Sequence, residues 1–382
     1  MPLLQLLISS MFIFFVLYAP QPLLTIFAHN FNVSTATSGA LMSLTMLPLA
    51  VAPIFYGLIF ARKNPLTILK VAMLVLSVTS LLFALAPSFE LLLTLRFIQG
   101  LTLPAALTAM TGFIGQQYNG TQLQQNMTRY IGSSILGGYL GRVLAANFAS
   151  WFSWQSFYYV LAVSLVILAL LIKPKRCEPP KREPASPSAY LKPLRHPLIA
   201  RLFGCVFCMF FCFAALMNYL PFILQDVFNI TDSKTIGWVY TGYLIGAVLS
   251  MATPHISRYF NNSWLFLSAL FTLYCLTLIA MQLPILSVFL IAFTLFCACM
   301  FMIHSTASPL ANKLSDAPPT VTNGAYVSFY YSGGALGSFI PGLILQSFGY
   351  HAFLMALLFM CAVGLALSYT TYKQGISITS GV

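Results

Sequence analysis

Charged side chains are scarce in this chain. Only 6% of its 382 residues are Asp, Glu, Lys or Arg, whereas soluble domains carry about 25%. Acidic residues are scarcer still, with six Asp and Glu against eighteen Lys and Arg. A chain of this length with so few charges cannot cover a folded surface with groups that water solvates. This composition excludes an ordinary soluble globular protein.

The sequence also lacks several motifs that carry chemistry. It has no phosphate-binding Gly-x-x-x-x-Gly-Lys-Ser/Thr loop and no His-Glu-x-x-His zinc motif, which argues against ATP-driven transport by this chain alone and against a metalloprotease. No acid, His and nucleophile stand together at helical spacing, so we expect no enzyme, no catalytic residue and no cofactor. A membrane-embedded enzyme acting on lipid has little support.

The eight cysteines do not form an obvious disulfide framework. Seven lie inside apolar stretches, where a free thiol behaves as a small hydrophobic side chain, and Cys177 lies in a basic loop. Cys205, Cys208 and Cys212 share one helix face, which leaves a thiol metal site open. No His or carboxylate accompanies them, and we expect no metal.

Apolar residues are abundant instead, at 59% of the chain, with a mean hydropathy of +0.87. A helix needs about 20 apolar residues to cross a bilayer. The stretches are too long and too uniformly apolar for barrel strands. We predict an all-α membrane protein with twelve transmembrane helices in two pseudo-symmetric bundles of six. The predicted spans are residues 3–28, 36–60, 66–87, 89–114, 127–149, 155–172, 198–224, 235–254, 263–283, 286–308, 322–345 and 351–372.

The basic residues predict the orientation of these spans. The net charge of +12 is spread beside the apolar stretches rather than gathered in a basic domain, which argues against nucleic-acid binding. With the N-terminus in the cytoplasm, nearly all loop cations fall inside, and Lys234 falls outside. The apolar N-terminus lacks a basic leader and a small-residue cleavage site, so we interpret it as the first span. Both termini are predicted to be cytoplasmic.

Two related halves are predicted, residues 1–172 and 198–382, joined by a Pro-rich, charged cytoplasmic linker over 173–197 that can also lie on the lipid surface. Phe31-Asn32-Val33-Ser34 recurs as Phe228-Asn229-Ile230-Thr231, and Gly137-Gly138 with Gly141 recurs as Gly333-Gly334 with Gly337. Both offsets are close to half the chain. Parallel repeats of this kind are typical of transporters built from two six-helix halves.

Several segments resemble a known family. LLLTLRFIQGLTLP, residues 91–104, resembles the fourth-span motif of major facilitator antiporters, with Arg96, Gln99 and Gly100 in place. ILGGYLGRVLA, residues 135–145, is similar to their fifth-span motif, although Gly138 replaces Pro and Arg142 replaces Gly. With the span-one segment YAPQPLL, residues 18–24, and the span-ten segment IHS, residues 303–305, this form resembles the YnfM-like branch. The resemblance implies a major facilitator fold and drug–proton antiport.

One motif of that family is eroded. Between spans two and three the family carries an Asp and Arg that latch the cytoplasmic gate, but this chain reads GLIFARKNPL from Gly57, with Ala61 in place of the Asp. The second copy, PHISRYFNNS, keeps Arg258 and has no acid. A carboxylate-based latch is therefore in doubt.

Two arginines lie well inside predicted spans, where a charge costs at least about 2.5 kcal/mol. Arg96 is a candidate for gating or proton relay, and Arg142 for contact with an anion or for a donor role in helix packing. The alternative for each is that its guanidinium binds backbone carbonyls of a neighbouring helix. No acid stands at mid-membrane. Asp226 is the nearest one, and a solvated helix-end carboxylate is the competing interpretation.

His304 is then the best remaining proton carrier, because imidazole titrates near neutral pH. The alternative is a neutral His bonded to a neighbouring helix, or a His near the inner membrane interface. His29, His255 and His351 lie at span ends and need no special role. The residues that we expect to shape the substrate cavity, for which an interfacial tyrosine belt is the alternative, are Tyr18, Gln21, Asn218, Tyr219, Tyr243, Tyr326 and Tyr330.

Small residues and prolines indicate how the spans pack and bend. Glycines allow helices to approach closely, and prolines free backbone carbonyls and kink a span. The glycines assigned to gating or helix packing are Gly100, Gly137, Gly138, Gly141, Gly333, Gly334 and Gly337. The prolines expected to kink spans are Pro20, Pro22, Pro48, Pro53, Pro104, Pro221 and Pro341.

Together these features predict a secondary active transporter that moves a small organic solute across the bacterial inner membrane by alternating access. Proton-coupled efflux is the family's default. The embedded arginines without a nearby acid favour an alternative, uptake or export of an organic anion such as a carboxylate or a siderophore. A transport-inactive, receptor-like relative is a third possibility. The expected partners are a small-molecule substrate, protons and the lipid bilayer, with no nucleic acid, and the protein is expected to be a monomer.

Overall fold

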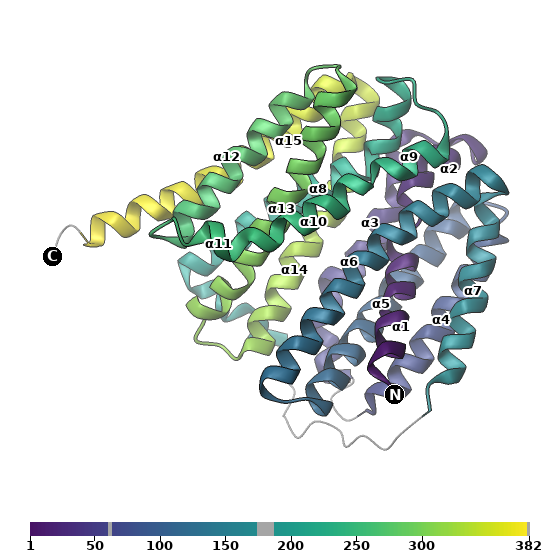
Figure 1. Cartoon of the computed structure of the whole chain (residues 1–382), viewed down its shortest axis with the longest axis horizontal. Coiled ribbons are helices and arrows are strands. Elements are labelled where there is room, and N and C mark those ends of the chain that lie inside the picture. The colour runs from purple at the N-terminus through teal and green to yellow at the C-terminus, as the bar shows by residue number, and fades with distance from the viewer. Residues whose placement is uncertain (60–62, 174–186, 380–382) are drawn as a thin grey trace. The chain divides into compact units, whose positions relative to one another are not determined.

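A computed structural model describes residues 1–59, 63–173 and 187–379, and within these ranges it contains helices and no strand (Figure 1). The predicted all-helical fold is confirmed. Ala61, Arg62 and Cys177 lie outside the described residues. The helices of the first part of the chain are α1 (Leu3–Tyr18), η1 (Gln21–Leu23), α2 (Leu24–Asn30), α3 (Thr35–Ile59), α4 (Pro65–Ala84), α5 (Phe89–Gln117), α6 (Gly120–Trp151) and α7 (Trp154–Leu171).

The rest of the chain follows the same pattern, again interrupted by short helical turns. Its helices are η2 (Pro187–Leu191), η3 (Pro193–Arg195), α8 (Pro197–Asp226), α9 (Ser233–Val239), α10 (Thr241–Leu249), η4 (Ser250–Ala252), α11 (Thr253–Ser257), α12 (Ser263–Met281), α13 (Leu286–Leu314), α14 (Pro319–Gly337) and α15 (Ile340–Thr379).

The twelve predicted spans can all be found in these helices. Ten described segments are long and apolar enough to cross a membrane. The predicted fifth span lies in α6, which is more polar and carries Arg142. The predicted eleventh and twelfth spans share the last segment, Pro319–Gln374, which is divided at Gly349, where φ is +79°. A φ in this range suits glycine, which has no Cβ to clash.

Short polar side chains set where several helices begin. Asn64 accepts a hydrogen bond from the Leu66 N–H at 2.9 Å, and Pro65 follows as the first residue of α4. Ser153 caps α7 by accepting from the Ser156 N–H at 3.3 Å. Such caps satisfy N–H groups that the first helical turn leaves without partners. The span boundaries therefore follow local sequence.

Proline explains the break in the first span. Helix α1 ends at Tyr18, and the chain resumes helically at Gln21 after Ala19 and Pro20. Because Pro20 has no N–H, the carbonyl of Val16 four residues earlier cannot make its helical hydrogen bond. Pro341 likewise follows the end of α14. By contrast, Pro104 and Pro221 lie inside the uninterrupted helices α5 and α8.

Contacts divide the chain into two compact units. The first contains Met1–Val33, Ala40–Ala185 and Ile230–Tyr240, and the second contains Ser34–Gly39, Ser186–Asn229 and Thr241–Val382. These units differ from the halves predicted from sequence by exchanging the short segments at Ser34–Gly39 and Ile230–Tyr240. The predicted domain boundaries stay a prediction.

Each unit contains a closely packed helix pair built on glycine. In the first unit, a Cβ at Gly137 of α6 would lie 2.7 Å from the Met11 Cα of α1. In the second, a Cβ at Gly333 of α14 would meet the backbone of Phe207 on α8. Gly333 lies 196 residues after Gly137, and Phe207 lies 196 residues after Met11. The same backbone approach is thus repeated in both units at one fixed offset.

The repeated Phe-Asn motif also folds the same way twice. Asn32 and Asn229 are the two described non-glycine residues with positive φ, at 49° and 54°. Asparagine tolerates this left-handed conformation better than most residues do. Each Asn follows the end of a span-forming helix, α2 or α8, and turns the chain toward the next helix. This shared conformation supports the parallel repeat predicted from sequence.

Candidate functional site

Arg142 is buried in the first unit, where α6 passes the break in the first span. Its side chain is 0% exposed. Its Nε donates to the Gln21 side-chain oxygen at 2.6 Å, and its Nη1 donates to the Gly138 carbonyl at 2.6 Å. Pro20 and Pro22 place Gln21 in the short η1 turn rather than in a continuous helix. The proline break therefore positions the amide that holds this guanidinium.

Two aromatic rings also contact the Arg142 guanidinium. Its Cζ lies 4.3 Å from the centroid of the Tyr18 ring and 5.5 Å from that of Tyr240. A cation over an aromatic face gains about 2 kcal/mol when it is desolvated. Gln21, Gly138, Tyr18 and Tyr240 surround Arg142 with an amide, a carbonyl and two rings, all formally neutral groups. We call these five residues the Arg142 cluster.

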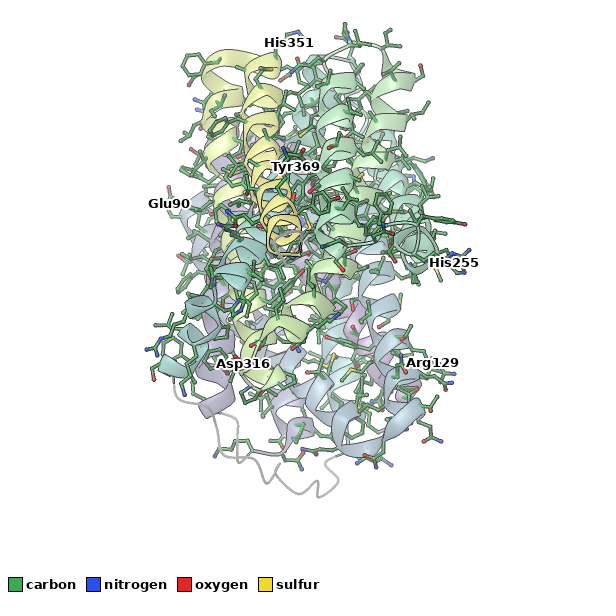
Figure 2. All side chains as sticks on the ribbon, turned by 90° about the vertical axis from the view of Figure 1, so that its left-hand side faces the viewer. Glu90, Arg129, His255, Asp316, His351 and Tyr369 are labelled. Carbon is green, nitrogen blue, oxygen red and sulfur yellow. The ribbon has the colours of Figure 1, made fainter. Side chains whose placement is uncertain are left out.

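Acidic side chains lie elsewhere among the described residues. Glu90 is in the first turn of α5, Asp226 is the last residue of α8, Asp232 caps α9, and Asp316 follows α13. Glu90 and Asp316 are exposed, as are the other labelled residues in Figure 2, Arg129, His255, His351 and Tyr369. Within the described residues, the helix interiors carry buried arginine and no mid-helix carboxylate.

Arg96 of α5 binds the other side of the span-one break. Its Nη1 donates to the Val16 carbonyl at 2.7 Å, its Nη2 to the Leu17 carbonyl at 3.0 Å, and its Nε to the Leu41 carbonyl of α3 at 3.1 Å. The Val16 carbonyl is the one freed by Pro20. The sequence left two roles open for Arg96, gating or proton relay and binding of backbone carbonyls. These hydrogen bonds have the geometry of carbonyl binding.

The remaining N–H groups of Arg96 also have partners. Nη1 donates to the Gln99 side-chain oxygen at 2.8 Å, and Nη2 contacts the Met42 sulfur at 3.7 Å. All five donors of this guanidinium are therefore used. Arg96 ties together helices α1, α3 and α5. Gly100, one turn along α5, allows the backbone of Thr45 on α3 to approach, since a Cβ there would lie 2.6 Å from the Thr45 carbonyl oxygen.

His304 forms the centre of a second cluster, in the second unit. Its Nδ1 lies 2.8 Å from the Tyr326 hydroxyl, within hydrogen-bond distance, and its ring centroid is 5.2 Å from that of Tyr330. Tyr330 in turn stacks on Phe210 of α8 with ring centroids 3.6 Å apart. Three residues predicted from sequence, His304, Tyr326 and Tyr330, are thus brought together from α13 and α14.

The other predicted residues of the second unit have separate surroundings. The Tyr219 hydroxyl donates to the Ser338 carbonyl at 2.8 Å, at the junction between α14 and α15. Its neighbour Asn218 is fully buried. Tyr243 packs with Phe213 and Phe301. These side chains hold helices together, and the structure does not bring Tyr219 into contact with His304.

Two more of the glycines assigned to packing lie against the backbone of a neighbouring helix. A Cβ at Gly141 would lie 2.9 Å from the Phe15 Cα, and one at Gly337 would meet the backbone of Phe211. Gly138 and Gly334 contribute carbonyls, to Arg142 Nη1 and to the Ser338 hydroxyl respectively.

The cysteine cluster is structural in its contacts. Cys212 donates to the Leu357 carbonyl at 3.3 Å, and Cys205 to that of Gly364 at 3.6 Å. Among the described residues, no group of three or more His, Cys, Asp or Glu is arranged to hold a metal ion.

Sequence reasoning missed Tyr240 as part of the Arg142 cluster. Tyr240 follows α9, a helix that lies far from Arg142 in the sequence but packs against α6 in the same unit. Gly237 permits this packing, because a Cβ there would lie 2.5 Å from the Cβ of Ala146. Nothing in the sequence distinguishes Tyr240 from the other tyrosines near span ends.

The family follows from comparison with known proteins. Residues 6–340 match the model of the Major Facilitator Superfamily. The chain belongs to the Major Facilitator Superfamily. It is 24% identical over 361 residues to the MFS-type transporter YybF of Bacillus subtilis, covering 93% of this chain and 89% of that protein. It is 23% identical over 239 residues to the inner membrane transport protein YnfM of Escherichia coli, covering 61% and 57%.

Solved structures agree with this membership at the level of the fold. A bacterial homologue of the human lysosomal transporter Spinster, in an inward-facing and occupied conformation, matches with a TM-score of 0.78, 13% identity and 97% and 96% coverage of the two chains. The nucleoside transporter NupG matches with a TM-score of 0.73, 15% identity and 96% and 98% coverage. The chain is therefore a membrane transporter of the major facilitator type, and the resemblance to this family seen in its sequence is confirmed.

Proposed function

We propose that this major facilitator protein is a secondary active transporter of a small organic anion, and that Arg142 is the group that contacts the anion. The observation that carries the proposal is the Arg142 cluster, a guanidinium buried among an amide, a carbonyl and two aromatic rings. A guanidinium offers a planar fork of donors that matches a carboxylate. The rings of Tyr18 and Tyr240 offer apolar contacts for the organic part of such an anion.

The position of the acids supports an anion rather than a cation. The four described carboxylates stand at or beyond helix ends, so they do not offer a counter-charge at mid-membrane for a cationic drug. A buried positive charge attracts an anionic solute and raises its local concentration. Efflux of cationic compounds, the default for the antiporters that the sequence resembles, fits this charge balance poorly.

The proposal is tested by transport in proteoliposomes. Purified protein is reconstituted, and uptake of labelled mono-, di- and tricarboxylates is compared with uptake of lipophilic cations of similar size. We expect at least one carboxylate to be moved, at a rate that Arg142→Gln lowers at least about tenfold, equivalent to about 1.4 kcal/mol. Arg129→Gln is the matched control, because Arg129 lies on the same helix and is exposed.

Three results would argue against the proposal. Transport of a carboxylate by Arg142→Gln at the wild-type rate would remove Arg142 from the site. Transport of cations alone would restore the antiporter interpretation. If no solute in the panel moves although the reconstituted protein is folded, the receptor-like alternative gains support. A stabilising ligand found in a thermal-shift screen would provide the next solute to test.

His304 is our candidate for proton coupling. Its hydrogen bond with Tyr326 and the absence of a mid-helix carboxylate among the described residues favour it over any acid. We expect His304→Gln to abolish accumulation driven by a pH gradient while leaving downhill exchange of the solute intact. Loss of both activities would instead indicate a structural role.

We further infer that the protein works as a monomer in the bacterial inner membrane, with both termini cytoplasmic.

A further inference from the structure

We propose that the first unit contains an internal water site beside Arg96, bounded by Gln99, Tyr158 and Ser80. The site is separate from the Arg142 cluster and does not depend on the proposed anion transport. Its argument begins with buried polar atoms. Within the described residues, the Gln99 side-chain nitrogen, the Tyr158 hydroxyl and the Ser80 hydroxyl have no hydrogen-bond partner. All three residues are essentially fully buried, with at most 1% exposure.

Contacts between helices place these groups in one region. Gln99 is joined to Arg96 through its side-chain oxygen at 2.8 Å. Tyr158 of α7 is placed near Arg96 by its neighbour Phe157, whose ring lies 6.4 Å from that of Phe15 on α1, next to the Val16 and Leu17 carbonyls that Arg96 binds. Arg96 cannot serve as the partner of Tyr158, because its five N–H groups already donate elsewhere.

Ser80 reaches the same region from α4. Helices α4 and α7 run antiparallel, since Ser77 donates to the Ala162 carbonyl at 2.7 Å while Phe83, further along α4, packs on the Tyr158 ring at 4.7 Å. Ser80 lies between these two contacts on the same face of α4. Its hydroxyl therefore faces the stretch of α7 that carries Tyr158.

The chemistry of these groups suits water. An unpaired buried polar group costs about 1–3 kcal/mol, and buried waters typically make about three hydrogen bonds to such groups. The Gln99 nitrogen offers two donors, while each hydroxyl can donate or accept. One water can accept from Gln99 and donate to a hydroxyl. This water would link α4, α5 and α7 next to the break in the first span, where Arg96 binds the Val16 and Leu17 carbonyls.

Hydroxyl-radical footprinting tests the site in the unmodified protein. X-ray radiolysis converts bound water into radicals that oxidise adjacent side chains, which mass spectrometry quantifies. Tyr219 is the matched control, because it is as deeply buried but its hydroxyl is satisfied by Ser338. We expect Tyr158 to be oxidised several-fold faster than Tyr219. Equal rates would overturn the proposal.

Thermal stability of Tyr158→Phe provides an independent measurement. If water bonds the phenol, removing the hydroxyl leaves the water short of a partner and lowers the Tm. If the site is dry, the substitution removes an unsatisfied polar group and raises the Tm. A raised Tm would therefore contradict the water site.

Discussion

Individual side chains in this transporter have two kinds of task, and the two buried arginines illustrate both. Arg96 gives every N–H to backbone carbonyls or to side chains of its own unit, so it stabilises the fold around a broken helix. Arg142 is held by Gln21 and Gly138 and lies over aromatic rings, and we propose that it contacts the solute. Sequence alone could not separate these tasks, because both residues are isolated cations in apolar helices.

Replacing Arg96 by lysine should destabilise the protein. Lysine keeps the positive charge but has no planar fork, so the carbonyls of Val16, Leu17 and Leu41 cannot all be satisfied. We expect the free energy of unfolding to fall by about 2–4 kcal/mol, because each lost hydrogen bond to a charged group costs about 1.5–3 kcal/mol. Thermal denaturation in detergent measures the change. Arg129→Lys should change it by less than about 0.5 kcal/mol, and a wild-type Tm for Arg96→Lys would refute the assigned role.

At the scale of elements, glycines decide which helices touch through their backbones. The pairs α1–α6 and α8–α14 have this property, and the Gly-Gly-x-x-Gly repeat marks the contact face of α6 and of α14. The identity of the partner helix was not foreseen, because a glycine pattern marks a contact face without saying what covers it. The span-one break was predictable from Pro20 and Pro22, whereas Pro104 and Pro221 gave the same signal and lie within unbroken helices.

Two glycines of α6 allow a direct test of this packing. Gly137→Ala should lower stability by about 1–3 kcal/mol, the usual cost of overpacking, since its Cβ would meet the Met11 backbone. Gly132→Ala on the same helix meets nothing within 4 Å and should be neutral or stabilising by up to about 1 kcal/mol. Comparing their unfolding midpoints gives the result. Equal effects of the two substitutions would mean that α1 and α6 do not approach closely.

The cap of α9 gives a prediction about pH. Hydrogen bonds from the Thr235 hydroxyl and N–H lower the pKa of Asp232 below its usual value. A lowered pKa in the folded protein means that the ionised cap stabilises the fold above the unfolded-state pKa of about 3.9. That contribution is lost as the pH falls through the folded-state pKa.

Asp232→Ala should therefore lower stability near pH 7 by about 0.5–1 kcal/mol, the low end for a cap because the residue is exposed. The difference between wild type and variant should stay constant from pH 7 to about 5 and shrink below about pH 4. Tm measured across this range checks the trend. If the Tm difference between wild type and Asp232→Ala instead grew as the pH fell, the Asp232 cap would not be the cause of that difference.

At the scale of the whole molecule, the sequence predicted the all-helical membrane fold and the transporter family. Hydropathy and the repeat at a nearly fixed offset predicted the fold, because lipid permits few architectures and each helix must span the same thickness. The family came from the resemblance of residues 91–104 and 135–145 to its motifs. The site was less predictable. Tyr18, Gln21 and Arg142 meet as a group, as do His304, Tyr326 and Tyr330, but Tyr240 joins Arg142 from a remote segment that no local pattern connects to it.

The predicted orientation can be tested with a native reporter. Cys177 lies in the basic stretch between the predicted sixth and seventh spans, whereas six of the seven other cysteines are buried and Cys275 is half-buried within α12. A membrane-impermeant maleimide should label Cys177 in inside-out vesicles and leave it unlabelled in intact spheroplasts. Cys177→Ser should abolish the label. Labelling of Cys177 in intact spheroplasts would place this stretch outside the cell and contradict the predicted orientation.

Both buried arginines bind the first span, one on each side of the break after Tyr18. Arg96 donates hydrogen bonds to the Val16 and Leu17 carbonyls just before the break, and Arg142 donates one to Gln21 just after it. Only Tyr18, Ala19 and Pro20 separate these two attachments. If the anion proposed to contact Arg142 replaced Gln21 as its partner, one end of this short segment would be released while Arg96 kept its hydrogen bonds to the other end. The bend of the first span would then change with occupancy of the Arg142 cluster.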